Sequence, residues 1–364
     1  MKTKVLMRNF ILLFLTFSLF FISSCSISDK SESKQKFVVM WSIYAGWMPW
    51  PYAEHKGILK KWADKYNIEI ELKQADYIPS IEAYVAGSAD GVVMTNMEAL
   101  NFAGTAGVDS TALIIGDYSN GNDAIITRNV SSPCDLGNKN VYLSKFSVSH
   151  YLLTRSLEIK CANKLNASEI NLINASDTDI GPIFITDKSQ EAVITWNPIV
   201  LEILKQDKKA KNIFDSSEIP YEILDIMFVN TKTLENNPEF GKALIGAWYE
   251  TLNQIKNPNT KTEALKYMAK KAGTDIDLFE QQLKTTNMWW EEEDALSVLQ
   301  SDTLLQAMDK VRKFSFENGL YGIGSQSADE IGIEFPNGKI LGDQKNIKIR
   351  FTDLYTILAT QDQL

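Results

Sequence analysis

Strand-like and helix-like stretches alternate along the first third of the chain, and this alternation limits the possible folds more than any other feature. A short apolar run at 37–40 is followed by a helical pattern at 53–66, whose apolar positions recur on one face. Further strand-like runs follow at 68–72, 91–95, 113–116 and 124–128. Alternating strands and helices are typical of a parallel sheet with helices on its faces, so the sequence predicts an α/β fold.

A second unit is expected to begin near residue 129. It contains three more strand-like runs and a helical stretch, at 140–143, 170–173, 191–195 and 149–159. An apolar run at 223–229 leads back to the first unit, and the remainder is mostly helical. Because 364 residues are many for one compact core, we predict two lobes joined by a hinge. Lobe 1 comprises 37–128 and 232–364, lobe 2 comprises 129–231, and the crossovers lie near 128–131 and 229–232.

The N-terminal segment has the features of a secretory signal. Three basic residues precede an apolar run at 10–22, which is short for a membrane span and ends in small residues. Residues 1–24 are therefore predicted to be a signal peptide, and the protein is expected outside the cytoplasm, in the periplasm or at the cell surface. Residues 25–36 are polar and are predicted to form a flexible tether.

The three cysteines have different expected roles. Cys25 follows small residues in an arrangement that resembles the lipobox of bacterial lipoproteins, which implies cleavage before Cys25 and a lipid anchor on its sulfur. An ordinary signal peptide with an incidental cysteine is the alternative. Cys134 and Cys161 could form a disulfide in that compartment or be two buried thiols, and the sequence does not decide between these possibilities.

The composition argues against several classes of function. The formal net charge is -9 and there is no basic run, which makes the chain a poor partner for nucleic acid. There is no CxxC pair or Cys/His cluster and there are only two histidines, so we predict neither a metal site nor a cofactor. The GxSxG, HExxH and P-loop patterns of common catalytic sites are also missing from the sequence.

An aromatic cluster, WSIYAGWMPWPY at 41–52, follows the first strand-like run. Gly46, Pro49 and Pro51 are expected to interrupt any helix, so the cluster is predicted to be a loop that leaves the strand. Ligands of open α/β sheets bind at the carboxyl ends of strands, where this loop begins. Ring faces with no Lys or Arg among them favour a small cation or a flat amide-like solute. Packing of the loop against the core is the alternative.

The order of several motifs resembles that of a known family. After the lipobox-like segment and the aromatic cluster come TNMEAL (95–100), IIGDYSNGNDAI (114–125), LSKFSVSHYLL (143–153), AVITWNPIV (192–200) and FTDLYTIL (351–358). This order is similar to that of the solute-binding proteins of ATP-binding-cassette (ABC) transporters, in the branch for nitrate, sulfonates, taurine and thiamine precursors. The stretches GWMPW, KKWADKY and VDSTALIIGDYSNGNDA further resemble the subfamily associated with the urea-carboxylase gene region.

The resemblance implies a bilobed, periplasmic-binding-protein-like fold of type II, with two lobes based on parallel sheets and a hinge between them. It also implies a monomer that closes on one small solute and delivers it to a membrane permease and its ATPase. Closure is favoured because the ligand contacts both lobes. Such a protein makes and breaks no bonds, so it is not expected to be an enzyme.

The predicted strand ends offer carboxyl, amide and aromatic side chains but no arginine. The candidate ligand-binding residues are Tyr44, Trp47, Trp50, Asn96, Glu98, Asp117, Asn122, Asp123, Ser147, Asp179, Trp196 and Asp225. An anion would require cationic or helix-N-terminal donors, whereas carboxylates and ring faces suit a guanidinium or ammonium ion. The predicted solute is a guanidinium-like cation, because one carboxylate can accept two of its N–H groups.

Several candidates have an ordinary structural alternative. Asp117, Asn122 and Asp123 flank a turn, where such residues are favoured, and Glu98 could serve the first turn of a helix. Ser147 is a candidate N-cap for the helix that follows it. If the end of that helix faces the cleft, it would favour an anion instead of a cation.

Other functions remain open at this point. The same transport role could serve urea, nitrate, a sulfonate or a pyrimidine precursor of thiamine. A periplasmic hydrolase could use Asp177 and Asp179 as paired acids, although such residues are more often part of a turn. A sensor module without a transporter would share the fold and the ligand binding.

Overall fold

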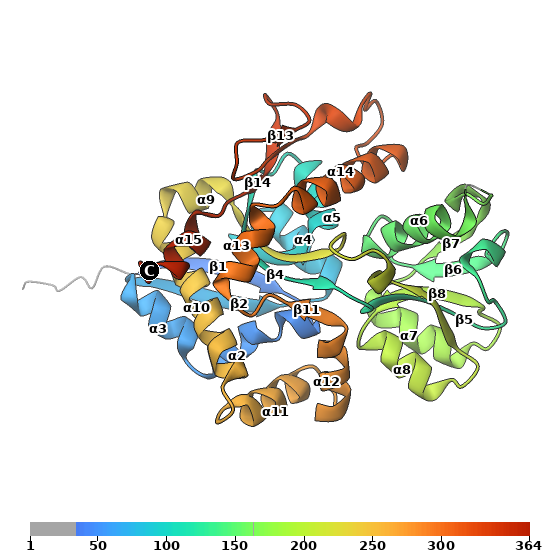
Figure 1. Cartoon of the computed structure of the whole chain (residues 1–364), viewed down its shortest axis with the longest axis horizontal. Helices are drawn as coiled ribbons and strands as arrows, with labels where there is room; N and C mark the ends of the chain where they lie inside the picture. The colour runs from blue at the N-terminus through green and yellow to red at the C-terminus, as the bar shows by residue number, and fades with distance from the viewer. Residues whose placement is uncertain (1–33, 163) are drawn as a thin grey trace, which may run out of the picture. The chain divides into compact units, whose positions relative to one another are not determined.

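The computed structural model describes residues 34–162 and 164–364, and Gln35–Leu364 form one compact unit (Figure 1). The predicted signal peptide, the lipidation of Cys25 and most of the predicted tether lie outside the described residues. No helix in the described part of the chain is long and apolar enough to cross a membrane. Two β-sheets organise the compact unit.

The larger sheet has nine strands in the order β13-β12-β14-β4-β10-β3-β1-β2, with β11 paired to β4. Its strands are β1 (Gln35–Trp41), β2 (Ile68–Gln74), β3 (Gly91–Thr95), β4 (Ser110–Ser119), β10 (Leu224–Asn230), β11 (Thr286–Met288), β12 (Gly332–Glu334), β13 (Ile340–Leu341) and β14 (Ile347–Phe351). β1 is parallel to β2 and β3, whereas β10 is antiparallel to β3 and β4. The sheet is therefore mixed, and β10 brings the chain back into its centre.

Helices pack on this sheet and on one another. They are α2 (Pro49–His55), α3 (Ile58–Lys65), α4 (Tyr77–Val85), α5 (Asn96–Glu98), α9 (Thr231–Asn236), α10 (Pro238–Lys256), α11 (Lys261–Lys271), α12 (Ile276–Lys284), α13 (Glu292–Leu299), α14 (Asp302–Glu317) and α15 (Leu354–Thr360). α10 contacts α2, α3 and α15, while α4 contacts β1 and β3. The apolar residues of α10 recur every four positions, from Phe240 to Leu252, and they are buried because they lie on one face.

The smaller sheet has five strands in the order β7-β6-β8-β5-β9. They are β5 (Asp123–Thr127), β6 (Asn140–Leu143), β7 (Asn171–Asn174), β8 (Ala192–Trp196) and β9 (Lys211–Asp215). In Figure 1, α6 (Val148–Cys161) lies along one side of this sheet, and α7 (Asp177–Thr186) and α8 (Ile199–Gln206) lie along the other. Parallel pairs join β6 to β7 and β8, and antiparallel pairs join β5 to β8 and β9.

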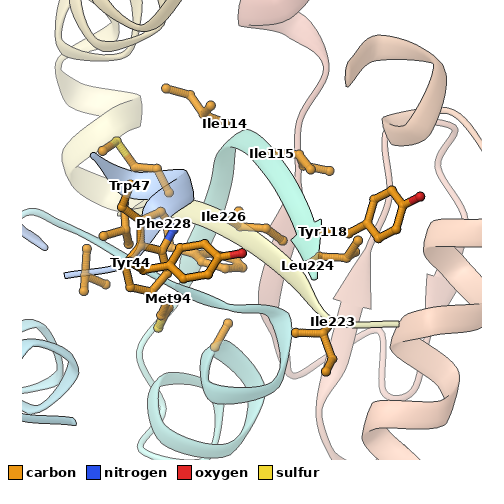
Figure 2. Packing of buried hydrophobic residues seen from close by; sticks show 14 of the residues in the cluster. Tyr44, Trp47, Met94, Ile114, Ile115, Tyr118, Ile223, Leu224, Ile226 and Phe228 are labelled. Carbon is orange, nitrogen blue, oxygen red and sulfur yellow. The ribbon is translucent and has the colours of Figure 1, made fainter. Parts of the chain in front are cut away.

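The central strands are covered on both faces. Every residue of β3, β4 and β5 is buried, as expected for strands that read as continuous apolar runs. Figure 2 shows side chains of β4 and β10 in the same buried cluster as Tyr44 and Trp47. The core of the larger sheet therefore extends to the end of β1, where the aromatic segment begins.

These features confirm the predicted α/β class with two sheet-based halves, although neither sheet is purely parallel. β5 belongs to the smaller sheet and β10 to the larger one, so the chain passes between the sheets at 120–122 and 216–223. Each crossover lies earlier in the chain than the predicted 128–131 and 229–232. Apolar runs show where strands are but not which sheet each strand joins. The division into two lobes at the predicted residues stays a prediction.

The aromatic segment 41–52 is not the irregular loop that the sequence predicted. Ala45–Trp47 form a 3-10 turn, and Pro49–His55 form α2. Pro49 is the first residue of this helix, and Pro51 still lies within its first turn. The first N–H groups of a helix have no intrahelical partner, so proline is tolerated at these positions. The segment is therefore partly helical, and its rings have fixed positions.

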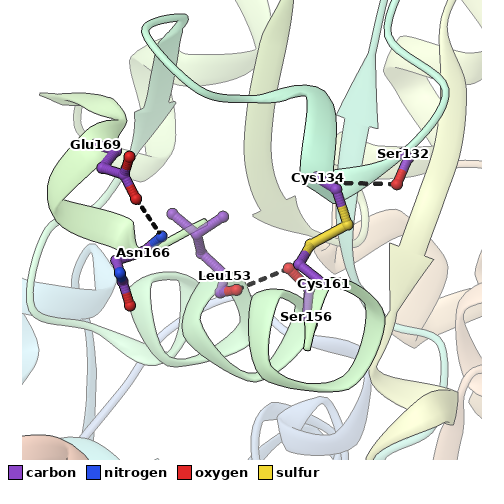
Figure 3. Close-up of a disulfide and its surroundings, with 7 residues drawn as sticks. All are labelled: Ser132, Cys134, Leu153, Ser156, Cys161, Asn166 and Glu169. Carbon is purple, nitrogen blue, oxygen red and sulfur yellow. Dashed lines mark hydrogen bonds between the residues drawn. A yellow bond between two sulfur atoms is a disulfide. The ribbon is translucent and has the colours of Figure 1, made fainter. Parts of the chain in front are cut away.

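Cys134 and Cys161 form a disulfide, one of the two possibilities that the sequence left open (Figure 3). It links the 3-10 turn Pro133–Asp135 to the last residue of α6, with the two Cα atoms 5.4 Å apart. The linked residues are separated by 27 positions. Closing a loop of this length stabilises the folded state by about 3.5 kcal/mol, because it restricts the unfolded chain.

Candidate functional site

A small cavity lies between elements that belong to the two sheets. It is lined by Ser42, Tyr44, Trp47, Tyr77, Thr95, Asn122, Asp123, Val148, Trp196, Ile223 and Asp225. The space open to the centre of a water molecule is ≈ 20 Å³. One water requires about 10–15 Å³ on this measure, so the cavity accepts a solute of only a few heavy atoms without further opening.

Both sheets supply the walls through the ends of their strands. Tyr44 follows β1, Thr95 ends β3, and Asp225 lies at the start of β10. From the other side come Asp123 at the start of β5 and Trp196 at the end of β8. The cavity therefore lies where a bound solute would contact elements of both sheets.

The strand register explains why the acidic residues meet. Asp225 of β10 pairs with Thr95 of β3 on one side and with Asp117 of β4 on the other. Directly paired residues point to the same face of a sheet, so these three side chains lie in one row. In the smaller sheet, Asp123 pairs with Trp196 in the same way. The sequence alone gives no direct sign of these pairings.

Asp117 lies behind the cavity wall and is fully buried. The Tyr44 hydroxyl donates a hydrogen bond of 2.7 Å to Asp117 Oδ1, and Asp117 Oδ2 has no partner among the described residues. Gly46 allows this approach, because a Cβ atom at this position would lie 2.1 Å from Asp117 Oδ2. Asp117 therefore holds Tyr44 in the wall while retaining a free acceptor oxygen.

Asp123 is held by a serine that lies four residues before it. The Ser119 hydroxyl donates to Asp123 Oδ2 over 2.5 Å, and the Asp123 N–H donates back to Ser119 Oγ over 3.2 Å. Ser119 Oγ also lies 2.6 Å from Ser216 Oγ. The turn that precedes β5 therefore orients this carboxyl group, and the same residue lines the cavity.

Burial dominates the electrostatics of these acids. It raises the pKa of Asp123 to about 7, and the charge of Glu98 adds to that rise. Burial likewise raises the pKa of Asp117 to about 7, against the hydrogen bond from Tyr44. The pKa of Asp225 is raised well above its ordinary value by burial and then by the charges of Asp117 and Asp123. The described residues that line the cavity include no lysine or arginine to offset these charges.

Four aromatic rings form a connected wall. Tyr44 and Trp47 meet edge to face with centroids 5.1 Å apart, and Trp47 lies 5.6 Å from Tyr77. Tyr77 meets Trp196 of the smaller sheet edge to face at 5.7 Å. Trp47 Nε1 and both polar side-chain atoms of Asn122 have no hydrogen-bond partner within the described residues. The wall therefore combines ring surface with polar groups that are free to bind a solute.

Six of the sequence-predicted site residues line the cavity, namely Tyr44, Trp47, Asn122, Asp123, Trp196 and Asp225. Two more, Asp117 and Glu98, lie directly behind it, because each accepts a hydrogen bond from a tyrosine in the wall. The structure thus brings together most of the acidic and aromatic candidates. Their role as ligand contacts stays a prediction.

Four predicted residues lie elsewhere. Trp50 stacks on Trp248 of α10 in the core, with centroids 5.1 Å apart, because α2 turns its ring away from the strand end. Asn96 hydrogen bonds to the backbone that leads into β10, through the Glu222 carbonyl and the Leu224 N–H. Asp179 is exposed and bonds to the N-cap of α7.

Ser147 is the N-cap of α6, which was the structural alternative considered for it. Its hydroxyl donates to the Ser144 carbonyl over 2.7 Å and accepts from the Ser149 N–H over 3.2 Å. The first N–H of this helix, on Val148, faces the cavity side and donates to Glu98 Oε1 over 2.8 Å. The end of α6 therefore reaches the site, but a carboxylate of the chain itself already occupies it.

Sequence reasoning missed Ser42, Tyr77, Thr95, Val148 and Ile223 as lining residues. Tyr77 and Thr95 had a readable signal, since Tyr77 follows the end of β2 and Thr95 is the last residue of β3. Ligand sites of α/β sheets are found at such positions. The sequence carries no such signal for Val148 and Ile223, because their place in the wall depends on how the two sheets approach each other.

Within the part of the chain that the structure describes, no group of three or more His, Cys, Asp or Glu side chains could hold a metal ion. The carboxyl groups are instead distributed along the walls. Asp117, Asp123 and Glu98 are each held by a hydroxyl or backbone donor. This arrangement suits several N–H donors of one organic solute.

No family model and no curated protein matches the chain. Solved structures do match. The periplasmic aliphatic sulphonate-binding protein SsuA from Escherichia coli is 17% identical over 79% of this chain and 94% of that chain, with a TM-score of 0.64. The alkanesulfonate-binding protein SsuA from Xanthomonas axonopodis pv. citri, bound to MOPS, is 15% identical over 79% and 95%, also with a TM-score of 0.64. The periplasmic nitrate-binding protein NrtA from Synechocystis is 11% identical over 84% and 95%, with a TM-score of 0.56.

At these identities the likeness shows the fold alone. The chain has the fold of periplasmic binding proteins, and the predicted fold class is confirmed.

Proposed function

We propose that this protein is the extracytoplasmic solute-binding component of an ABC importer, and that it binds a small nitrogen-rich cation of the guanidinium type. The observation that carries the choice of ligand is the set of buried carboxyl groups around a cavity whose described lining includes no basic residue. Burying a charge without a partner is costly. A bound cation would supply the missing partner for Asp123, Asp225 and Asp117.

A planar guanidinium ion fits the chemistry of the walls. It presents N–H donors in a plane, which carboxylate oxygens accept in pairs, and its faces can lie against aromatic rings. Asp225 and Asp123 line the cavity from the two sheets, so one cation could bridge them. A ligand that contacts both sides favours the closed arrangement. Asn122 Oδ1 is a further acceptor without a partner in the described residues.

The size of the cavity supports a small solute. Guanidinium has four heavy atoms, more than the one or two waters that ≈ 20 Å³ can hold, so a slight opening of the walls would admit it. Longer solutes such as agmatine would require the walls to separate. The order of affinity expected from size is therefore guanidinium first, methylguanidine second and agmatine last.

Urea is the second candidate, and one observation favours it. The Trp47 indole N–H is buried and has no acceptor among the described residues. Urea carries a carbonyl oxygen that could accept this bond, whereas guanidinium has donors only. Urea would leave the charges of Asp123 and Asp225 uncompensated, so we place it second.

The transport role rests on the fold and on the sequence resemblance. Structures with the same fold bear the names of sulfonate- and nitrate-binding periplasmic proteins. In this proposal, residues 1–24 are removed as a signal peptide and Cys25 carries a lipid anchor. A monomer with two lobes, one around each sheet, then delivers its solute to a permease and its ATPase. No chemical step is assigned to the protein.

A thermal-shift screen of the purified protein tests the choice of ligand. The solutes are guanidinium, urea, methylguanidine, agmatine, nitrate, taurine and a thiamine pyrimidine precursor. A ligand at about 100 times its dissociation constant stabilises the folded state by about 2.7 kcal/mol. We expect guanidinium to give the largest shift at low concentration. A shift with nitrate or taurine and none with guanidinium would contradict the proposal.

Two aspartates, one in the smaller sheet and one in a helix beside it, provide a matched pair of variants. Asp123→Asn removes a carboxylate that lines the cavity, and Asp179→Asn removes an exposed one outside it. Guanidinium should stabilise Asp179→Asn as it does the native protein, and Asp123→Asn much less. Equal shifts in both variants would show that the cation binds elsewhere.

A further inference from the structure

Glu98 holds an unusual position behind the cavity. It is the last residue of α5 and fully buried, and its two oxygens accept from three donors. The Tyr77 hydroxyl donates to Oε2 over 2.8 Å, the Thr95 hydroxyl donates to the same oxygen, and the Val148 N–H donates to Oε1 over 2.8 Å. All three donor residues line the cavity.

The direction of these hydrogen bonds is fixed by the neighbouring backbone. The Thr95 N–H donates to the Tyr77 hydroxyl oxygen over 3.0 Å, and the Met97 N–H donates to the Thr95 hydroxyl oxygen over 3.2 Å. Each hydroxyl therefore already accepts a bond, which leaves its own proton for Glu98. The Val148 N–H can only donate. Three hydrogen-bond donors that converge on one point form a group that can bind an anion.

The donors also come from both halves of the structure. Thr95 ends β3 of the larger sheet and Tyr77 begins α4 beside it, whereas Val148 is the first residue of α6 next to the smaller sheet. The N-terminus of a helix attracts negative charge. Without Glu98, the wall would present two hydroxyls and a helix end to whatever enters the cavity.

We propose that Glu98 determines the charge selectivity of the site, because its carboxylate fills a set of donors that would otherwise bind a small anion. This inference rests on the proposed function, since it concerns the same cavity. The filled donor set removes the anion-binding groups from the wall. It also adds a fixed negative charge behind the cavity, which favours a cation.

The energetics of Glu98 agree with this role. Burial raises the pKa of Glu98, and the bonds from Thr95, Tyr77 and Val148 each act in the opposite direction. The charge of Glu98 also contributes to the raised pKa of Asp123. On balance the pKa of Glu98 is raised, and the three donors limit that rise because they stabilise the charged form.

The test uses Glu98→Ala, with Asp117→Ala as the matched control. Both variants remove a fully buried carboxylate directly behind the cavity, but among the described residues Asp117 accepts from the Tyr44 hydroxyl and from no backbone N–H. The probes are formate, acetate and nitrate, added to each variant in a thermal-shift experiment. We expect all three anions to raise the melting temperature of Glu98→Ala, with no effect on the native protein or on Asp117→Ala.

A second readout is ligand selectivity. In Glu98→Ala, the affinity for guanidinium should fall at least 10-fold and recover in part when acetate is added. The inference is overturned if no anion stabilises Glu98→Ala. A preference of this variant for cations equal to that of the native protein would also overturn it. If Glu98→Ala is insoluble, purification with formate or acetate should restore a soluble protein. If Glu98→Ala stays insoluble even then, Glu98→Gln is measured in its place. The inference is overturned if Glu98→Gln prefers cations over anions as strongly as the native protein does.

The two proposals can fail separately. Stabilisation of Glu98→Ala by formate does not depend on which solute the native protein binds. If the native protein does not bind guanidinium while Glu98→Ala binds formate, the proposed ligand is wrong and the role of Glu98 holds. If the native protein binds guanidinium and Glu98→Ala binds no anion, the proposed ligand holds and the proposed role of Glu98 is wrong.

Discussion

Lowering the pH from 7.5 to 5.5 should weaken the binding of guanidinium, because the cation requires ionised carboxylates. Burial raises the pKa of Asp123 from 3.8 to about 7 in the ligand-free protein. At pH 7.5 most Asp123 is ionised, whereas at pH 5.5 most of it carries a proton that the cation must displace. A single group with this pKa reduces the affinity about 25-fold over this interval. Guanidinium itself stays protonated throughout, as arginine does.

Isothermal titration calorimetry at both pH values measures this effect. Titrations in two buffers with different heats of ionisation also count the protons that are released on binding. We expect at least one proton per ligand at pH 5.5 and fewer at pH 7.5, with more as Asp117 and Asp225 lose protons as well, since burial raises the pKa of both. An affinity that is unchanged or higher at pH 5.5 would refute the reasoning.

The stability of the ligand-free protein should change in the opposite direction. When folding raises the pKa of a carboxyl group and the pH lies between its unfolded-state and folded-state pKa, the group binds more protons in the folded protein than in the unfolded chain. Stability therefore falls as the pH rises through that interval. For Asp123 the interval runs from 3.8 to about 7. The ligand-free protein should therefore be about 2 kcal/mol more stable at pH 5.5 than at pH 7.5 from this group alone. Asp123→Asn should remove this contribution, which thermal unfolding at both pH values would show.

Three further changes have distinct expected results. Asp225→Asn should raise the melting temperature without ligand, because it removes a carboxyl group whose ionisation is opposed by burial and by the charge of Asp117. The same change should weaken guanidinium binding about 30-fold or more, as calorimetry would show. Reducing the Cys134–Cys161 disulfide should lower the unfolding free energy by about 3.5 kcal/mol, and an unchanged thermal transition would contradict this. Gly46→Ala should leave the circular dichroism spectrum native while the affinity falls more than 10-fold, because its Cβ would lie 2.1 Å from Asp117 Oδ2.

Much of the fold could be predicted because its signals are local. The buried strands β3, β4 and β10 are apolar runs, and α10 repeats large apolar residues every four positions. The assignment of β5 and β10 to their sheets could not be predicted, since strand pairing depends on residues far apart in the chain. β10, for example, pairs with β3 and β4, which lie more than 100 positions earlier.

The site was predictable in its chemistry more than in its geometry. Acidic and aromatic residues at strand ends pointed to Asp123, Asp225 and Tyr44, and these residues do line one cavity. Trp50 was misplaced, because the proline-containing segment forms a helix and turns this ring onto Trp248. A tryptophan at a strand end can face a ligand or the core, and only the helix that follows decides which.

The role of the helix end at Ser147 shows the same limit. The sequence suggested an N-cap and, if the helix faced the cleft, a preference for anions. The structure places Val148 in the cavity wall, and the Val148 N–H donates a hydrogen bond to Glu98, which lies 50 positions earlier in the chain. The sequence supplied both residues, but their contact depends on how the two sheets approach each other.

The central claim is that the cavity binds a small cation and excludes small anions. The most direct measurement is calorimetric titration of the purified protein at pH 7.5 with guanidinium, nitrate and taurine in turn. We predict saturable one-to-one binding of guanidinium, with no heat of binding for nitrate or taurine. Saturable binding of nitrate or taurine, with none for guanidinium, would contradict the account.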